Sequence, residues 1–326
     1  MGDRGQDSPA VPASRSRALH RFAVLTAVST LVLIVAGGLV TSTESGLSVP
    51  DWPLSYGKLM PPMVGGVFYE HGHRMVATTV GILTVILAIW LARSDSRRSV
   101  KRLGLLAVAA VIAQGVLGGL TVLYLLPTPV SVAHACLAQA FFCLVVAIAV
   151  VTSPRWQPAS GRLGAASRLA ALTAGAVFVQ LVIGAVMRHT KSGLAIPDFP
   201  LSYGRVVPPL DSFPVAIAFA HRAWALAVAV LAFAAASAAS RSGLRRTGVF
   251  LGSLVLVQIA LGAATVLSGK AVAITTAHVA IGALLLGTAL ALSLGAGARR
   301  SHKERRPETS KRWLEPFRAR VTHAGR

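Results

Sequence analysis

The chain has 326 residues, of which 54% are hydrophobic and only 13% are charged. So few charged residues could hardly cover the surface of a soluble domain, and this composition indicates a membrane protein. The formal net charge is +21, but the basic residues stand in the tails and in short segments between apolar runs. This distribution is typical of loops beside anionic lipid, and it argues against nucleic acid as the partner.

Eight apolar runs are long enough to cross the hydrocarbon core, which takes about 20 helical residues. In chain order they are Phe22–Val40, Met75–Ala92, Leu103–Leu126, Val130–Val151, Leu169–Val186, Val215–Ala239, Val249–Leu267 and Ala271–Ala296. The first run is too long for the apolar core of a cleavable signal and is interpreted as a spanning helix. The sequence therefore predicts an all-α polytopic membrane protein with eight transmembrane helices.

Lysine and arginine are concentrated in alternate connections between these runs. One set comprises the N-terminal tail, segments 93–102, 155–168 and 241–246, and the chain from 299 onward. The other set holds only Lys58, Lys191, Arg205 and Lys270, with Arg188 at the end of a span. The positive-inside rule then makes the first set cytoplasmic, and both termini are predicted to lie inside.

The chain also repeats itself. The segment GLSVPDWPLSYG at 46–57 recurs as GLAIPDFPLSYG at 193–204, 147 residues later. The segment from Gln114 to His134 recurs from Gln258 to His278 at a spacing of 144. Matches at nearly one offset indicate a duplication. Because each copy has an even number of spans, both enter the membrane from the same side, which predicts two parallel-repeat four-helix bundles.

This repeat divides the chain into two halves with connecting segments. We expect a basic cytoplasmic tail at 1–21 and another at 297–326, and we expect no catalytic role for the C-terminal one. The N-terminal half is placed at 22–152 and the C-terminal half at 169–296, joined by a cytoplasmic linker at 153–168.

Four histidines occupy matching places in the two halves. His73 and His134 lie near the starts of the second and fourth spans, and His221 and His278 near the starts of the sixth and eighth. All four should therefore lie toward the extracytoplasmic side, and ionisable groups inside a membrane are usually functional. Neutral imidazole is a common axial ligand of haem iron, whereas zinc would need further ligands that do not repeat here. The pattern predicts two bis-histidine haem sites.

The remaining histidines fit these sites less well. His71 points to a different side of its helix from His73, and His189 lies at a span end in an outer loop. The other three lie in cytoplasmic polar sequence and are expected to be solvated: His20, His302 and His323.

One carboxylate distinguishes the halves. Glu70 lies three residues before His73, on the same helix face, whereas Ala218 stands at the matching place before His221. A carboxylate beside an iron ligand can accept protons or position water. The alternatives are hydrogen-bonded support for the imidazole or a solvated interfacial glutamate.

Two arginines follow histidines directly, Arg74 after His73 and Arg222 after His221. Arginine makes bidentate contacts to carboxylates, so both are candidates to bind haem propionates. Snorkelling toward lipid headgroups is an equal alternative.

The two repeated outer loops carry paired aromatics, Trp52 with Tyr56 and Phe199 with Tyr203. These rings are expected either to cap the haem pockets or to anchor the loops at the membrane interface. The aspartate of each loop is expected to cap its turn: Asp51 and Asp198.

From about Phe22 to Ala296 the chain resembles the haem A synthase family, membrane enzymes that oxidise haem O for cytochrome oxidase. The resemblance is carried by GGLVT at 37–41, SGL at 45–47, the motif Glu70-x-x-His73-Arg74 and one histidine in each later even-numbered span.

The resemblance implies that haem O binds as the substrate near His73 and His134, with Glu70 required for the reaction. It implies a haem B for electron transfer between His221 and His278. One porphyrin methyl group would be oxidised by successive hydroxylations to a formyl group. The partners implied are a haem O synthase and an electron acceptor, with a possible homo-oligomer, in a bacterial cytoplasmic membrane.

The chain departs from many bacterial members, which carry a cysteine pair in an outer loop. Val49 and Ser55 stand in that neighbourhood, and the only cysteines are Cys136 and Cys143, within one apolar run. They are expected to be buried packing residues, and a thiol–disulfide step is excluded.

Two other functions remain open from the residues. A dihaem b-type electron carrier linked to quinol would use the same histidines without a special N-terminal pocket. A transporter built on the repeat is disfavoured because the spans contain few other charges.

Overall fold

The computed structural model describes residues 17–156 and 164–304, with side chains described only as far as 295. Its helices are α1 (Arg17–Ser42), α2 (Gly66–Ser94), α3 (Arg98–Leu123), α4 (Thr128–Thr152), α5 (Ala165–His189), η1 (Ser192–Leu194), α6 (Phe213–Arg241), α7 (Arg245–Leu267) and α8 (Val272–Glu304). Eight of them are long and apolar enough to cross a membrane, which confirms the predicted all-α polytopic fold.

Several helices extend beyond the apolar runs that predicted them. α1 begins at Arg17, inside the segment assigned to the N-terminal tail, and α8 continues to Glu304, beyond the expected end of its span. Hydrophobicity reports the part of a helix that lies in lipid, whereas the backbone hydrogen bonds continue into the polar flanks. The rest of both tails, including His323, and the linker residues 157–163 lie outside the described residues, as does the side chain of His302.

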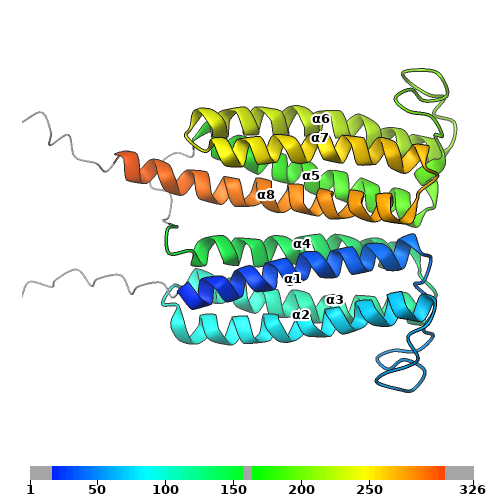
Figure 1. Ribbon diagram of the computed structural model, residues 1–326, viewed down its shortest axis with the longest axis horizontal. Helices are drawn as coiled ribbons and strands as arrows, with labels where there is room; N and C mark the ends of the chain where they lie inside the picture. Colours follow the sequence, from blue (N-terminus) through cyan, green and yellow to red (C-terminus); the bar gives the residue numbers. More distant parts are fainter. Residues whose placement is uncertain (1–16, 157–163, 305–326) are drawn as a thin grey trace, which may run out of the picture.

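The eight spanning helices form two four-helix bundles that lie side by side (Figure 1). In the first bundle α1 contacts α2 and α4, and α3 contacts α2 and α4; α5 to α8 repeat this ring. The bundles meet through α1 with α8, α4 with α5, and α4 with α8. Exchanging each helix for its counterpart in the other bundle reproduces this set of contacts, as a twofold relation requires.

The bundles pack through small residues. In the C-terminal bundle, four alanines of α6 are buried against Leu251 and Leu254 of α7: Ala232, Ala235, Ala236 and Ala239. Between the bundles, a Cβ on Gly287 of α8 would lie 2.8 Å from the Phe142 ring of α4. Small side chains let helix backbones approach closely, and such approach replaces the hydrophobic driving force that is absent in lipid.

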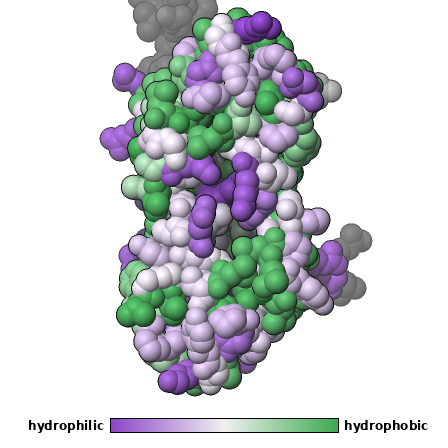
Figure 2. Space-filling model, turned by 90° about the vertical axis from the view of Figure 1, so that its right-hand side faces the viewer, coloured by the Kyte–Doolittle hydropathy of each residue, from purple (hydrophilic) through white to green (hydrophobic). Residues whose placement is uncertain are grey.

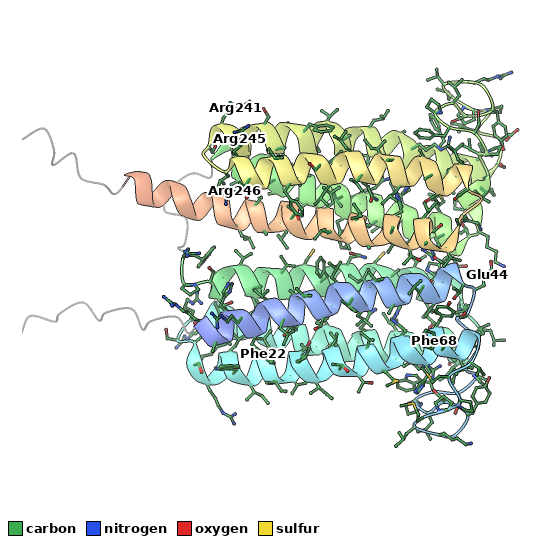
Figure 3. All side chains as sticks on the ribbon, in the orientation of Figure 1. Phe22, Glu44, Phe68, Arg241, Arg245 and Arg246 are labelled. Carbon is green, nitrogen blue, oxygen red and sulfur yellow. The ribbon has the colours of Figure 1, made fainter. Side chains whose placement is uncertain are left out.

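The arginines around the connection of α6 and α7 lie at the end of the molecule opposite the outer loops. Figure 3 shows Arg241, Arg245 and Arg246 at one end, opposite Glu44 and Phe68. The long outer loops lie at the end that holds Glu44 (Figure 1). The sidedness drawn from the positive-inside rule stays a prediction that this distribution supports.

α7 packs very closely against α6 at Gly248, which has no side chain. A Cβ on Gly248 would lie 2.4 Å from the backbone oxygen of Ala236 and 2.5 Å from Ser240 Oγ. We expect Gly248→Ala to force α6 and α7 apart and to lower stability by about 1–3 kcal/mol. A lower thermal unfolding midpoint of the purified protein would check this.

Gly175→Ala on α5 is the matched control, because a Cβ there meets nothing within 4 Å and alanine favours the helix. Equal unfolding midpoints for the two variants would contradict the close packing of α7 on α6.

Candidate functional site

Each of the four repeated histidines lies against a glycine of the preceding helix. The pairs are Gly37 with His73, Gly118 with His134, Gly184 with His221, and Gly262 with His278. A Cβ on any of these glycines would lie 3.1 or 3.2 Å from Cε1 of its histidine. A methyl group there would require the ring to shift by a few tenths of an ångström, and the structure contains four equivalent imidazole cradles.

Glutamines accompany three of the four histidines. Gln114 donates to the backbone oxygen of His134 at 3.0 Å, and Gln180 to that of His221 at 2.9 Å. Gln258 Nε2 lies 3.3 Å from Nε2 of His278. Gln114 precedes His134 by the same number of residues as Gln258 precedes His278, so the repeat in the sequence could have indicated these two glutamines as partners. Gln180 was missed because its counterpart in the first half is Leu33.

In the C-terminal half the two imidazoles face each other. The ring centroids of His221 and His278 are 6.5 Å apart, and the rings are tilted by 59°. A metal–imidazole nitrogen bond is about 2 Å long, so two rings that share one metal ion have centres roughly 6 Å apart. This pair therefore has the separation of two ligands on opposite sides of one ion. In the N-terminal half, His73 and His134 are close enough to interact electrostatically.

The donor set fits haem better than a zinc-type site. Among the residues that the structure describes, no group of three or more His, Cys, Asp or Glu side chains could hold a metal ion. A macrocycle supplies four ligands itself and needs only axial ones from the protein. His73, His134 and His278 each have a buried Nδ1 without a hydrogen-bond partner. Buried polar atoms of this kind normally find partners, so these rings are available to a bound group.

Glu70 is only 3% exposed, so the solvated interfacial alternative is wrong. Its Oε2 accepts a hydrogen bond from the backbone N–H of Val49 at 2.8 Å, and its Oε1 pairs with Arg74 at 2.8 Å. Glu70 thus joins α2 to the outer loop of the N-terminal half. The sequence did not indicate this contact, because Val49 lies far from Glu70 along the chain.

The arginines after the histidines also hold the outer loops. Arg74 Nη1 donates to the backbone oxygens of Asp51 and Leu54 at 2.7 and 2.9 Å. Arg222 Nη1 donates to the equivalent oxygens of Asp198 and Leu201 at 2.8 and 3.0 Å. Binding of propionates by Arg74 and Arg222 stays a prediction, and their η nitrogens already donate to loop carbonyls. The sequence suggested propionate binding or snorkelling for these arginines, and neither interpretation included a hydrogen bond to the outer loops.

His71 was expected to fit the haem sites less well than His73, and the structure buries it beneath the same outer loop. Its Nδ1 lies 2.8 Å from Ser55 Oγ. The matching residue in the second half is Phe219, so this hydrogen bond exists only in the N-terminal half. His20 was expected to be solvated, but it is half-buried and its Nδ1 donates to Ala149 O at 3.0 Å. That expectation was wrong because α1 begins before the apolar run.

Both loop aspartates cap their turns, as predicted. Asp51 accepts from the backbone N–H groups of Tyr56 and Gly57 at 2.6 and 2.8 Å. Asp198 makes the same two bonds to Tyr203 and Gly204. Tyr56 has a φ of 54°, a left-handed conformation that these hydrogen bonds stabilise.

Trp52 of the first outer loop packs against α3. A Cβ on Gly119 would lie 2.6 Å from Cδ2 of Trp52, and Gly119 follows the Gly118 that faces His134. The matching residues in the second half are Ala263 and Phe199. Trp52 is held against the bundle on one side, while 42% of its surface is exposed. Capping of the haem pocket by this ring therefore stays a prediction.

Other described features lie away from these sites. A cavity of about 470 Å³ lies between α1, α4 and α8, with His20 and Arg155 among its lining residues. It contains none of the four repeated histidines. Cys136 and Cys143 are free and half-buried, less enclosed than expected.

The hydrogen bonds from Gly57 and Tyr56 hold the pKa of Asp51 below its usual value. A carboxylate with a depressed pKa contributes its full stabilisation above the unfolded-state pKa, about 4, and loses it as pH falls through the folded-state pKa. We therefore expect the amide exchange protection of Tyr56 and Gly57 to be constant from neutral pH to about pH 5 and to fall only below about pH 4.

Asp51→Asn should lower this protection above about pH 5 and remove the acid transition. The exposed Asp211 supplies the control, because Asp211→Asn should leave the exchange of this loop unchanged. Unaltered protection in Asp51→Asn would show that the carboxylate does not hold the turn.

Comparison with known proteins agrees with this geometry. The model of a family described as cytochrome oxidase assembly proteins, COX15-CtaA, matches residues 20–65 and 66–290. A haem A synthase of Halalkalibacterium halodurans is 31% identical over 83% of this chain and 95% of its own length. Those of Rhizorhabdus wittichii and Symbiobacterium thermophilum are 28% and 30% identical, over 86% and 76% of this chain and 95% and 85% of their own lengths.

Proposed function

The chain belongs to the COX15-CtaA family of cytochrome oxidase assembly proteins, and we propose that it is a haem A synthase. In this role it oxidises a methyl group of haem O to a formyl group within the membrane. The substrate iron is held by His73 and His134 in the N-terminal half. A haem B is held by His221 and His278 in the C-terminal half.

The observation that carries this proposal is an asymmetry built on a repeated frame. Both halves hold two histidines in equivalent glycine cradles, but Glu70 and His71 of the first half are replaced by Ala218 and Phe219 in the second. Two identical electron-transfer sites would need no such difference. The relatives, all haem A synthases, likewise do not favour the dihaem electron carrier.

Glu70 and Arg74 act on the reaction through the outer loop that they hold. Glu70 fixes the backbone of Val49, and Arg74 fixes Asp51 and Leu54. The loop then places Trp52 against α3 beside the His134 cradle. A held loop excludes water from the site and orients the macrocycle, which protects a reactive intermediate from side reactions.

The C-terminal half is suited to a resident group. Haem B supplies one-electron redox chemistry when it is bound. His221 and His278 would hold this group. Gln180 donates to the backbone oxygen of His221, and the amide of Gln258 lies 3.3 Å from the His278 ring. Hydrogen bonds around ligating imidazoles fix ring orientation and tune the metal.

The remaining assignments follow from the same function. The protein lies in the bacterial cytoplasmic membrane with its haem sites toward the extracytoplasmic side. A haem O synthase supplies the substrate, and an electron acceptor takes up the electrons released by the oxidation. A homo-oligomer is compatible with this arrangement.

We expect Glu70→Ala to abolish haem A formation while the haem B spectrum of the C-terminal half persists. The loop would lose its contact at Val49, whereas α6 and α8 are untouched. The test is co-expression with a source of haem O, followed by chromatographic identification of the extracted haems.

Glu44→Ala is the matched control, since Glu44 is an exposed carboxylate at the same end of the molecule. Glu70→Gln tests the charge separately, because a glutamine oxygen can still accept from Val49 but cannot form the ion pair with Arg74. Normal haem A output from Glu70→Ala would refute the assignment of Glu70.

The two histidine pairs should fail differently when they are removed. We expect His221→Ala or His278→Ala to eliminate the haem B spectrum, and His73→Ala or His134→Ala to retain it while haem A is lost. Absorption spectra of the purified variants, with His20→Ala as control, would check this. Two haem B molecules and no haem O or haem A in the native protein would contradict the proposed function and support the electron carrier.

A further inference from the structure

Arg188 is a cation at the outer end of α5 that has no carboxylate partner among the residues that the structure describes. The ion pairs among the described residues are Arg74 with Glu70 and Arg97 with Asp95. Arg188 Nη2 instead donates to two neutral acceptors of α1, the backbone oxygen of Gly38 at 3.2 Å and Ser42 Oγ at 2.8 Å. An uncompensated charge at the membrane edge is costly and usually serves a function.

The position of Arg188 on α5 directs it toward the C-terminal haem site. Gln180, Gly184 and Arg188 are spaced four apart and so lie on one helix face. Gly184 cradles the ring of His221, and Gln180 donates to the backbone oxygen of the same histidine. Arg188 therefore stands one helical turn, about 5 to 6 Å, outward of the residues that contact His221.

The second histidine of this half is also close to Arg188. The guanidinium and His278 are near enough to interact electrostatically. Thr276, on the same helix, donates to Ser42 Oγ at 3.2 Å, the hydroxyl that accepts from Arg188. Hydrophilic side chains gather where the two bundles meet at the loop end of the molecule (Figure 2). Arg188 thus lies where α1, α5 and α8 meet, beyond His221 along α5 and within electrostatic reach of His278.

The first half has no counterpart to this cation. The residues that match Gln180 and Arg188 are Leu33 and Thr41. Arg74 and Arg222, the arginines that the sequence offered for propionates, already donate to loop carbonyls. The C-terminal half, which would keep its haem, therefore has an arginine at this position. The N-terminal half, whose product must leave, has Thr41 instead.

We propose that Arg188 is a positioning residue that binds a carboxylate of the macrocycle held by His221 and His278, and that its charge raises the redox potential of that site. The proposal rests on the proposed function, because it requires a haem B in the C-terminal half. Arginine pairs well with carboxylates in partly buried sites. A nearby cation disfavours the oxidised iron, which carries the higher positive charge.

The experiment compares Arg188→Gln with Arg188→Lys in the full-length purified protein. Arg188→Gln should lower the midpoint potential of the haem B and weaken its retention by about tenfold, the effect of one charge-assisted hydrogen bond. Arg188→Lys should restore most of the potential, because it keeps the charge. Redox titration and the rate of haem transfer to an apo-globin acceptor measure the two effects.

Two controls separate this role from a structural tie between the bundles. Ser42→Ala removes the neutral acceptor of Arg188 but keeps the charge, so the potential should not change. Lys191→Gln removes an exposed cation three residues away and should leave both readouts unchanged. If Arg188→Gln matches Lys191→Gln in potential and retention, Arg188 does not bind the macrocycle.

Failure of the inference is distinguishable from failure of the proposed function. A haem B that depends on His221 but is unaffected by Arg188→Gln overturns the role of Arg188 alone. A native protein whose C-terminal half contains no haem B overturns both.

Discussion

The contact on which this structure depends is an imidazole lying against a glycine of the neighbouring helix. It occurs four times, on α2, α4, α6 and α8, with a Cβ-to-ring separation that would be 3.1 or 3.2 Å. A contact this close fixes the register of each helix against its neighbour, and any side chain in place of the glycine would displace the ring. Two of these histidine–glycine contacts lie in each bundle, close to the outer loops.

The two halves then diverge in the residues around the same points. The N-terminal half adds Glu70 and His71, which bind the outer loop through Val49 and Ser55. The C-terminal half instead adds Gln180 and Arg188 along one face of α5. Each addition is polar and either buried or half-buried, and groups of that kind are costly unless they are paired. The two halves thus contain different buried polar side chains, which is consistent with one site that turns over a substrate and one that keeps a cofactor.

The outer loops are part of the sites rather than connections between helices. Each is closed on itself by an aspartate and held to its bundle by an arginine: Asp51 with Arg74, and Asp198 with Arg222. Two loops of the same local structure lie over two bundles, yet only the first has the additional contacts of Glu70 and His71. The difference between the halves therefore extends from the helices into the loops that cover them.

The sequence by itself determined the eight spans, the duplication and the four histidines, because hydrophobicity and spacing are local properties that any copy of the repeat displays. It also identified Glu70 as the residue that breaks the repeat, and the loop aspartates as turn caps. It placed Arg74 and Arg222 at haem or lipid and judged that His71 fits the haem sites less well, because the loop partners of these side chains lie 16 to 26 residues away along the chain. Only the tertiary structure decided these contacts, and only it brought Arg188 of α5 to Gly38 of α1, since helix-to-helix proximity depends on packing that no local pattern records.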